Sequence, residues 1–216
     1  MRMKTFLLVV ACGCLAASAS SVDDAVLDVD LPPSAGVKNS AFGAWPIVQV
    51  PGEDYDISGF RLNMPIGKHR SFAGLDFGVV ANVVSGRASG VAFSTVGNMA
   101  GRGQALVQMA AVFNSVDHVS RGMQLSCANV AGDDYMGVQL GPVNLTGLIG
   151  GLQLGIYNQA ERVGGVQFGV LNIAGELNGV QFGLLNIASE SSVPVLPLLH
   201  IGYCGDVRGL PCSVFF

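Results

Sequence analysis

Residues 165–172 read Gly-Val-Gln-Phe-Gly-Val-Leu-Asn, and residues 179–186 read Gly-Val-Gln-Phe-Gly-Leu-Leu-Asn. The same pattern, Gly-x-Gln-x-Gly-x-x-Asn, occurs at residues 137–144 and 151–158. A pattern that recurs at a fixed period is typical of one structural unit copied along the chain. The sequence therefore predicts a repeat-built fold rather than a mixed globular domain.

The asparagine that ends this pattern extends the period beyond the four clear copies. Eight asparagines follow one another at spacings of 16, 16, 15, 15, 14, 14 and 14 residues: Asn82, Asn98, Asn114, Asn129, Asn144, Asn158, Asn172 and Asn186. Glutamines hold equivalent places in five copies: Gln124, Gln139, Gln153, Gln167 and Gln181. The copies at 91–98 and 106–114 lack the second glycine. We expect these amides to be structural repeat positions, in a ladder or on a solvated face, in preference to a polar lumen or a glycan site.

The repeat unit reads as β-structure. Glycine every four residues is costly in a helix, and no period-3.6 stripe is present. Alternation with a period of two places Val166, Phe168 and Asn172 on one face of a strand and Gln167 on the other. Most charged residues lie between these strands, as at residues 161–162. The predicted fold class is all-β.

The favoured architecture is an up-and-down antiparallel β-barrel of about 12 strands in an outer membrane. A strand of about 10 residues, tilted by ~45°, rises about 23 Å, close to the ~25 Å apolar band of such barrels. Turn-type residues at 53–56 and 68–71 predict hairpins. The terminal Phe216 resembles the signal by which bacterial outer-membrane barrels are recognised for assembly.

The alternative architecture is a β-solenoid with one coil of 14–16 residues per repeat. Stacking by translation would place like residues above one another, so the asparagines would form an internal amide ladder. Phe168 would then stack on Phe182. The half-repeat after each asparagine is short and polar, which disfavours a second core face.

The N-terminus predicts export. Residues 1–19 are expected to be a secretory signal peptide, because Arg2 and Lys4 precede a short apolar run and Ala17-Ser-Ala19 is a small-x-small cleavage site. An alternative is lipidation of Cys12, since Val9-Val-Ala-Cys12 loosely resembles a lipoprotein signal.

The remaining chain divides by composition. Residues 20–43 are expected to be an acidic, flexible lead-in, and residues 44–216 a single β-repeat domain. Within that domain the repeats occupy about 74–190 and closing strands occupy 193–216.

Composition excludes several classes of protein. Charged residues are 12 % and hydrophobic residues 50 % of the chain, which excludes intrinsic disorder. Without residues 1–19, nine basic residues face fifteen acidic ones, a net charge near −6, which argues against a nucleic-acid partner. His69, His118 and His200 lack metal-ligand spacing, so no metal or other cofactor is expected.

Three cysteines follow the predicted signal: Cys127, Cys204 and Cys212. Export makes a disulfide chemically possible, and Cys204 and Cys212 flank a short turn that one could staple. Three separate thiols are the alternative, and Cys127 has no assigned partner.

A family resemblance follows from ordered motifs. Gly59-Phe-Arg-Leu-Asn-Met-Pro-Ile-Gly-Lys68, then Gly74-Leu-Asp-Phe-Gly78 and the repeats, resembles the bacterial surface-repeat family of leptospiral type, and Leu196-Pro-Leu-Leu199 is similar to that family's end. The resemblance covers about residues 45–203. It implies an exported, envelope-associated bacterial protein and implies no activity.

The expected function is that of a non-enzymatic exported protein of the outer membrane or cell surface. The favoured form is the barrel, in contact with membrane lipid, in a structural or small-pore role. The alternative is a secreted or surface-tethered β-solenoid that binds a glycan or a protein. No catalytic residue is predicted, because Gly-x-Ser-x-Gly and phosphate-loop signatures are missing from the sequence.

Overall fold

The computed structural model describes residues 33–44, 48–203 and 213–214, and this part of the chain is all β, as predicted. The strands in chain order are β1 (Val37–Ala44), β2 (Val48–Val50), β3 (Asp56–Asn63), β4 (Ile66–His69), β5 (Ser71–Gly78), β6 (Ala81–Ser94), β7 (Gly97–Ala110), β8 (Phe113–Val116), β9 (Ser120–Leu125), β10 (Ala128–Leu140), β11 (Val143–Ile149), β12 (Leu152–Leu154), β13 (Tyr157–Val163), β14 (Val166–Phe168), β15 (Leu171–Leu177), β16 (Gly179–Ala188), β17 (Val195–Tyr203) and β18 (Ser213–Val214).

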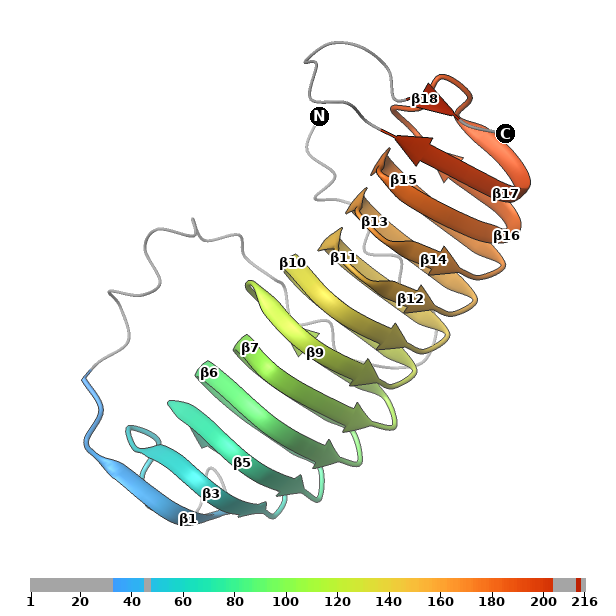
Figure 1. Ribbon diagram of the computed structural model, residues 1–216. Helices are drawn as coiled ribbons and strands as arrows, with labels where there is room; N and C mark the ends of the chain where they lie inside the picture. The colour runs from blue at the N-terminus through green and yellow to red at the C-terminus, as the bar shows by residue number, and fades with distance from the viewer. Residues whose placement is uncertain (1–32, 45–47, 204–212, 215–216) are drawn as a thin grey trace.

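The strands form a β-solenoid of about ten coils, which confirms the alternative architecture. Figure 1 shows the coils stacked along one axis from β1 to β17. Neighbouring coils pair in parallel and in register, so Asn144 lies opposite Asn158 and Asn158 opposite Asn172. At the ~4.8 Å spacing of paired strands, the first and last of ten coils lie about 43 Å apart.

The favoured prediction, an antiparallel β-barrel, is wrong. β11, β13 and β15 pair in parallel, and among the described strands antiparallel pairs are confined to the two ends, β1 with β2, β16 with β17 and β17 with β18. Alternation along one strand is the same in both architectures. The two architectures differ only in how the chain connects one strand to its neighbour. In this protein the connection brings the chain back to the same side, so the next coil runs in the same direction.

A corner inside each repeat explains the misreading. β14 ends at Phe168, the chain turns at Gly169-Val170, and β15 begins at Leu171. The corner resets the alternation, so Gln167 and Asn172 both point inward, although an unbroken strand would place them on opposite faces. Pro142 occupies the same corner one coil lower than Ile156, outside any strand, where a missing N–H is tolerated.

The N-terminal coils show the same error. The predicted hairpins at 53–56 and 68–71 do not form, because β3 and β5 pair in parallel and β4 contains Lys68 and His69. Likewise the charged pair at residues 161–162 lies within β13 rather than between strands. β-Structure also begins at Val37, inside the segment 20–43 that we expected to be a lead-in.

The core of each coil is thin. Behind the asparagine, the coils of Asn158 and Asn172 each contribute two further inward side chains, an alanine and a larger aliphatic residue, and Tyr135 takes the larger place after Asn129. Ala160, Ala174 and Ala188 are at most 1 % exposed, as are Ile149, Val163 and Leu177. These columns provide the second core face that the sequence did not reveal.

Candidate functional site

Two ladders of buried amides run through the solenoid. In the asparagine ladder, Asn144 Nδ2 donates to Asn158 Oδ1 at 2.8 Å, and Asn158 Nδ2 donates to Asn172 Oδ1 at 2.8 Å. In the glutamine ladder, Gln153 Nε2 donates to Gln139 Oε1 at 2.8 Å, in the opposite direction along the axis. Amide side chains carry both donors and acceptors, so each ladder pairs most of its buried groups with neighbouring coils. Gln181 Oε1, at the end of the glutamine ladder, is buried without a partner among the described residues.

The predicted repeat positions are therefore structural and inaccessible. Those that are completely buried comprise Asn129, Asn144, Asn158, Asn172 and Asn186, together with Gln139, Gln153, Gln167 and Gln181, and Gln124 is 1 % exposed. A polar lumen or a glycan site built on these residues is excluded by this burial. The structure adds Gln108, which accepts a hydrogen bond from Gln124 Nε2 at 2.9 Å.

A buried ion pair replaces the glutamine ladder at its N-terminal end. Arg61 and Asp76 occupy the column in which the later coils carry glutamine. Arg61 Nε donates to Asp76 Oδ1 at 2.8 Å, and Arg61 Nη2 contacts the other carboxylate oxygen. Asn63 Nδ2 also donates to Asp76 Oδ1, at 2.8 Å. Burial raises the pKa of Asp76, and the bonds to Arg61 oppose this change.

His69 packs against this ion pair and stays neutral. Its Nδ1 lies 3.1 Å from Arg61 Nη1, and the residue is fully buried. Burial lowers the pKa of His69 to about 4, and the positive charge of Arg61 contributes to the change, while Glu53 opposes it. Between pH 4 and 6.5 the unfolded state therefore binds more protons than the folded state.

We expect this difference to make stability fall with acidity. The contribution of His69 is complete above pH 6.5 and is lost as the pH falls to about 4, for a total of about 3 kcal/mol. His69→Gln removes the titration, whereas the raised pKa of Asp76, which acts in the opposite sense, is present in both proteins. The measurement is the free energy of unfolding of both proteins from pH 4 to 7. Parallel curves for the two proteins would contradict the prediction.

The outer surface, in contrast, is apolar on two broad faces. The first broad face carries the outward residues of two aligned columns: Phe77, Phe93, Met109, Leu125, Leu140, Leu154, Phe168, Phe182 and Leu199, and beside them Leu75, Val91, Val107, Met123, Val138, Leu152, Val166, Val180 and Ile201. Phe77 stacks on Phe93 with ring centroids 5.3 Å apart. The second broad face carries the outward residues of β11, β13, β15 and the end of β16, such as Leu171 and Ile173. The column of Ile173 also contains Gln159, Ser115 and, in its first coil, Lys68, which pairs with Glu53.

The corner between the two faces is also mostly apolar. We call it the rim; its exposed residues are Val79, Thr95, Ala111, Cys127, Pro142, Ile156, Val170 and Leu184, and Thr95 interrupts its apolar character. Ile156 is 60 % exposed and Leu184 is 67 % exposed. Such contiguous exposed apolar surface marks an interaction site in a folded protein.

Charges gather on the side opposite the rim. Between residues 77 and 203 every Asp, Glu, Lys and Arg lies on or next to this charged edge: Arg87, Arg102, Asp117, Arg121, Asp133, Asp134, Glu161, Arg162, Glu176 and Glu190. Both signs are present, and Arg162 lies 3.8 Å from Asp134. The solenoid is thus amphipathic across its width and not along its length.

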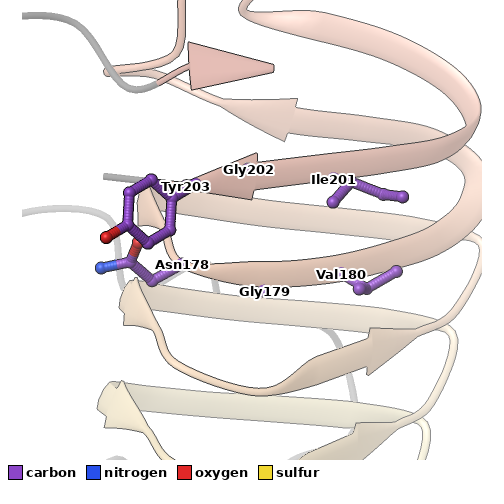
Figure 2. A pocket seen from close by; sticks show the side chains of 6 residues that line it. All are labelled: Asn178, Gly179, Val180, Ile201, Gly202 and Tyr203. Carbon is purple, nitrogen blue, oxygen red and sulfur yellow. The ribbon is translucent and has the colours of Figure 1, made fainter. Parts of the chain in front are cut away.

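A surface depression lies at the C-terminal end of the described solenoid. It measures about 460 Å³ and lies between β16 and β17. Figure 2 shows Tyr203 beside Asn178 at one end and Val180 beside Ile201 at the other. The lining residues are Asn178, Gly179, Val180, Ile201, Gly202 and Tyr203, a mostly apolar set that extends the first broad face.

The histidines and cysteines considered in the sequence analysis form no metal site among the described residues. His118 Nδ1 lies 3.0 Å from Asp133 on the charged edge, and His200 is buried beneath Ser191. The described residues contain no group of three His, Cys, Asp or Glu that could hold a metal. Cys127 is a free, exposed thiol on the rim. Cys12, Cys204 and Cys212 lie outside the described residues, as do the predicted signal peptide and Phe216.

Sequence reasoning missed the ion pair, although a signal existed. Gly59-Phe-Arg61-Leu and Gly74-Leu-Asp76-Phe follow the repeat pattern with a charged residue in place of glutamine. Aligning these two copies would have placed Arg61 and Asp76 at equivalent positions of neighbouring coils. Among the described residues, no helix has the length and apolarity needed to cross a membrane. No family model, curated protein or solved structure matches this chain, so its resemblance to the leptospiral surface-repeat family stays a prediction.

Proposed function

We propose that this protein is an exported, envelope-associated β-solenoid that acts as a rigid, non-enzymatic interaction module. The observation that supports this function is the separation of surfaces, with two apolar faces and an apolar rim opposite one charged edge. Its repeated polar side chains, which could otherwise form a binding site, are engaged with one another inside the coils. The binding surface is therefore apolar.

This surface favours an apolar partner over a glycan. Glycans are recognised largely through hydrogen bonds, and the glutamine and asparagine columns are buried. The exposed columns of Phe, Leu, Ile and Val offer apolar surface instead. Its burial contributes a favourable free energy of roughly 25 cal/mol for each Å² removed from water. A partner that covers several coils would bury apolar surface on each of them, so its binding free energy would increase with the number of coils covered.

Export is supported by the sequence pattern of residues 1–19 and by the family resemblance. The test is expression of the full chain in a Gram-negative host, followed by fractionation and mass determination of the product. We expect a chain that begins at Ser20 in the envelope fraction. Leu8→Arg, which interrupts the apolar run, should leave the uncleaved chain in the cytoplasm. An uncleaved wild-type chain in the cytoplasm would contradict export, and a lipid mass on Cys12 would support the lipoprotein alternative.

A further inference from the structure

The position of the uncharged surface restricts what can cover it. A protein partner with a flat surface covers one broad face and leaves the other face and the rim exposed. Here both broad faces carry aligned columns that are mostly apolar, with Gln159 among the exceptions, and on the rim between them Leu184 is 67 % exposed. A surrounding medium covers all three sides at once. The hydrocarbon of a lipid bilayer is such a medium.

The width of the apolar region matches half a bilayer. The five residues 171–175 separate the rim at Val170 from the charged edge at Glu176. Val170 and Glu176 are six residues apart, so at ~3.3 Å per residue this distance is about 20 Å. One leaflet is about 15 Å thick in its hydrocarbon part and about 20–22 Å thick with its headgroups. With the rim near the middle of the bilayer, the charged edge would therefore lie at the depth of the headgroups.

Backbone groups along the stack are compatible with such a medium, which tolerates no unpaired N–H or C=O. The strands pair from coil to coil, and the rim corners pair as well. Val170 N donates to the Ile156 carbonyl oxygen at 3.0 Å, and Ile156 N donates to that of Pro142 at 3.0 Å. Within the described residues, open backbone edges remain at the two ends of the stack.

We propose that this solenoid inserts edge-on into one leaflet of a lipid bilayer, with the rim and both broad faces among the acyl chains and the charged edge among the headgroups. This inference deepens the proposed function and rests on the same apolar surface. The charged edge has no excess of basic residues, since it carries four arginines against six carboxylates. Insertion should therefore need no anionic lipid and should persist at high salt.

The first test is flotation of the purified full chain with phosphatidylcholine vesicles in a density gradient. We expect the wild-type chain to float with the vesicles at 0.15 M and at 1 M salt. The double variant Ile156→Asp, Leu184→Asp places two carboxylates on the rim, and its partition should fall at least tenfold. Ser189→Asp adds a carboxylate to the charged edge of the coil that contains Leu184, and its partition should stay within twofold of wild type.

Insertion depth supplies the second test. Cys127 lies on the rim, so a fluorophore attached there, with the other four cysteines changed to serine, reports the acyl region. Lipids brominated along the acyl chain should quench this fluorophore strongly. They should quench one attached at Ser189→Cys weakly, in a chain that also carries Cys127→Ser. Equal quenching at both sites would overturn the edge-on orientation.

Three outcomes separate the inference from the proposed function. Failure of the wild-type chain to float would overturn lipid insertion. If that chain instead forms a defined oligomer that Leu184→Asp dissociates, a second copy occupies the apolar surface. Flotation of the purified chain without export in cells would leave the inference standing and overturn the proposed envelope location. The circular dichroism and thermal midpoint of each variant must match those of wild type, so that loss of binding is not loss of fold.

Discussion

Replacing Asn158 with alanine is expected to lower the free energy of unfolding by about 3 kcal/mol. Asn158 Nδ2 donates to Asn172 Oδ1 at 2.8 Å and to the Phe168 carbonyl oxygen at 3.0 Å, and its Oδ1 accepts from Asn144 Nδ2 at 2.8 Å. Alanine removes all three bonds and leaves Asn172 Oδ1 without its donor. An unpaired buried acceptor costs about 1–3 kcal/mol, and each lost bond adds to this.

The position of Asn158 makes the effect larger than that of an end residue. Each coil of a solenoid is stabilised mainly by its two neighbours, and Asn158 joins the coils on both sides. Glu161→Ala is the matched control, because Glu161 lies on the same strand and is exposed. The measurement is thermal unfolding followed by circular dichroism, with a decrease of about 6–12 °C for Asn158→Ala. Equal midpoints for the two variants would refute a stabilising role for the ladder.

The ladders also explain which part of the fold could be predicted from the sequence. The positions of Asn144, Asn158 and Asn172 repeat because in-register stacking places like amides in hydrogen-bonding contact, and this period is visible in the sequence. The corner at Gly169-Val170 is not visible in the same way, because its two residues continue the alternation of an unbroken strand. Strand content followed from local pattern, whereas parallel or antiparallel pairing depends on contacts between residues that lie far apart.

The candidate site shows the same division. The apolar side chains were recognised as one face of a strand, and lipid was considered as their environment in a barrel. Their arrangement around three sides of a thin solenoid depends on the corner and on the bend before Leu177, where Gly175 and Glu176 both point away from the core. The ion pair of Arg61 with Asp76 was not predicted, because the repeat pattern was defined by its amides and not by the column that they occupy.

The distribution of polar and apolar side chains in this protein is unusual. Amides occupy the interior beside the aliphatic columns and bond mostly to one another, while Phe168, Ile156 and Leu184 are exposed by more than half of their area. A chain that folds in water alone gains little from this arrangement, since the exposed apolar area contributes nothing until it is covered. The fold is consistent with a surface whose favourable free energy is realised on binding.

Replacing Gly165 with alanine should have the largest effect of any change considered, a loss of more than about 4 kcal/mol or failure to fold. A Cβ at this position would lie 2.1 Å from the carbonyl oxygen of Gly151 in the preceding coil. That oxygen accepts the backbone bond from Val166 N at 2.7 Å, so the coils can separate only by breaking their pairing. The same contact recurs one coil lower, where a Cβ on Gly151 would lie 2.0 Å from the Gly137 carbonyl oxygen.

The preceding residue provides the control, because the chain reads Gly164-Gly165. A Cβ on Gly164 meets only the Ile149 carbonyl oxygen, at 3.6 Å, an ordinary contact. Gly164→Ala should therefore stay within about 0.5 kcal/mol of wild type. Soluble yield and thermal midpoint of the two variants are the measurements. If Gly165→Ala folds with the midpoint of Gly164→Ala, the coils are farther apart than the parallel stack requires. Since one methyl group decides the outcome, the glycine is required by the coil spacing itself; where Leu106 takes this position, the register shifts between Gly103 and Leu106.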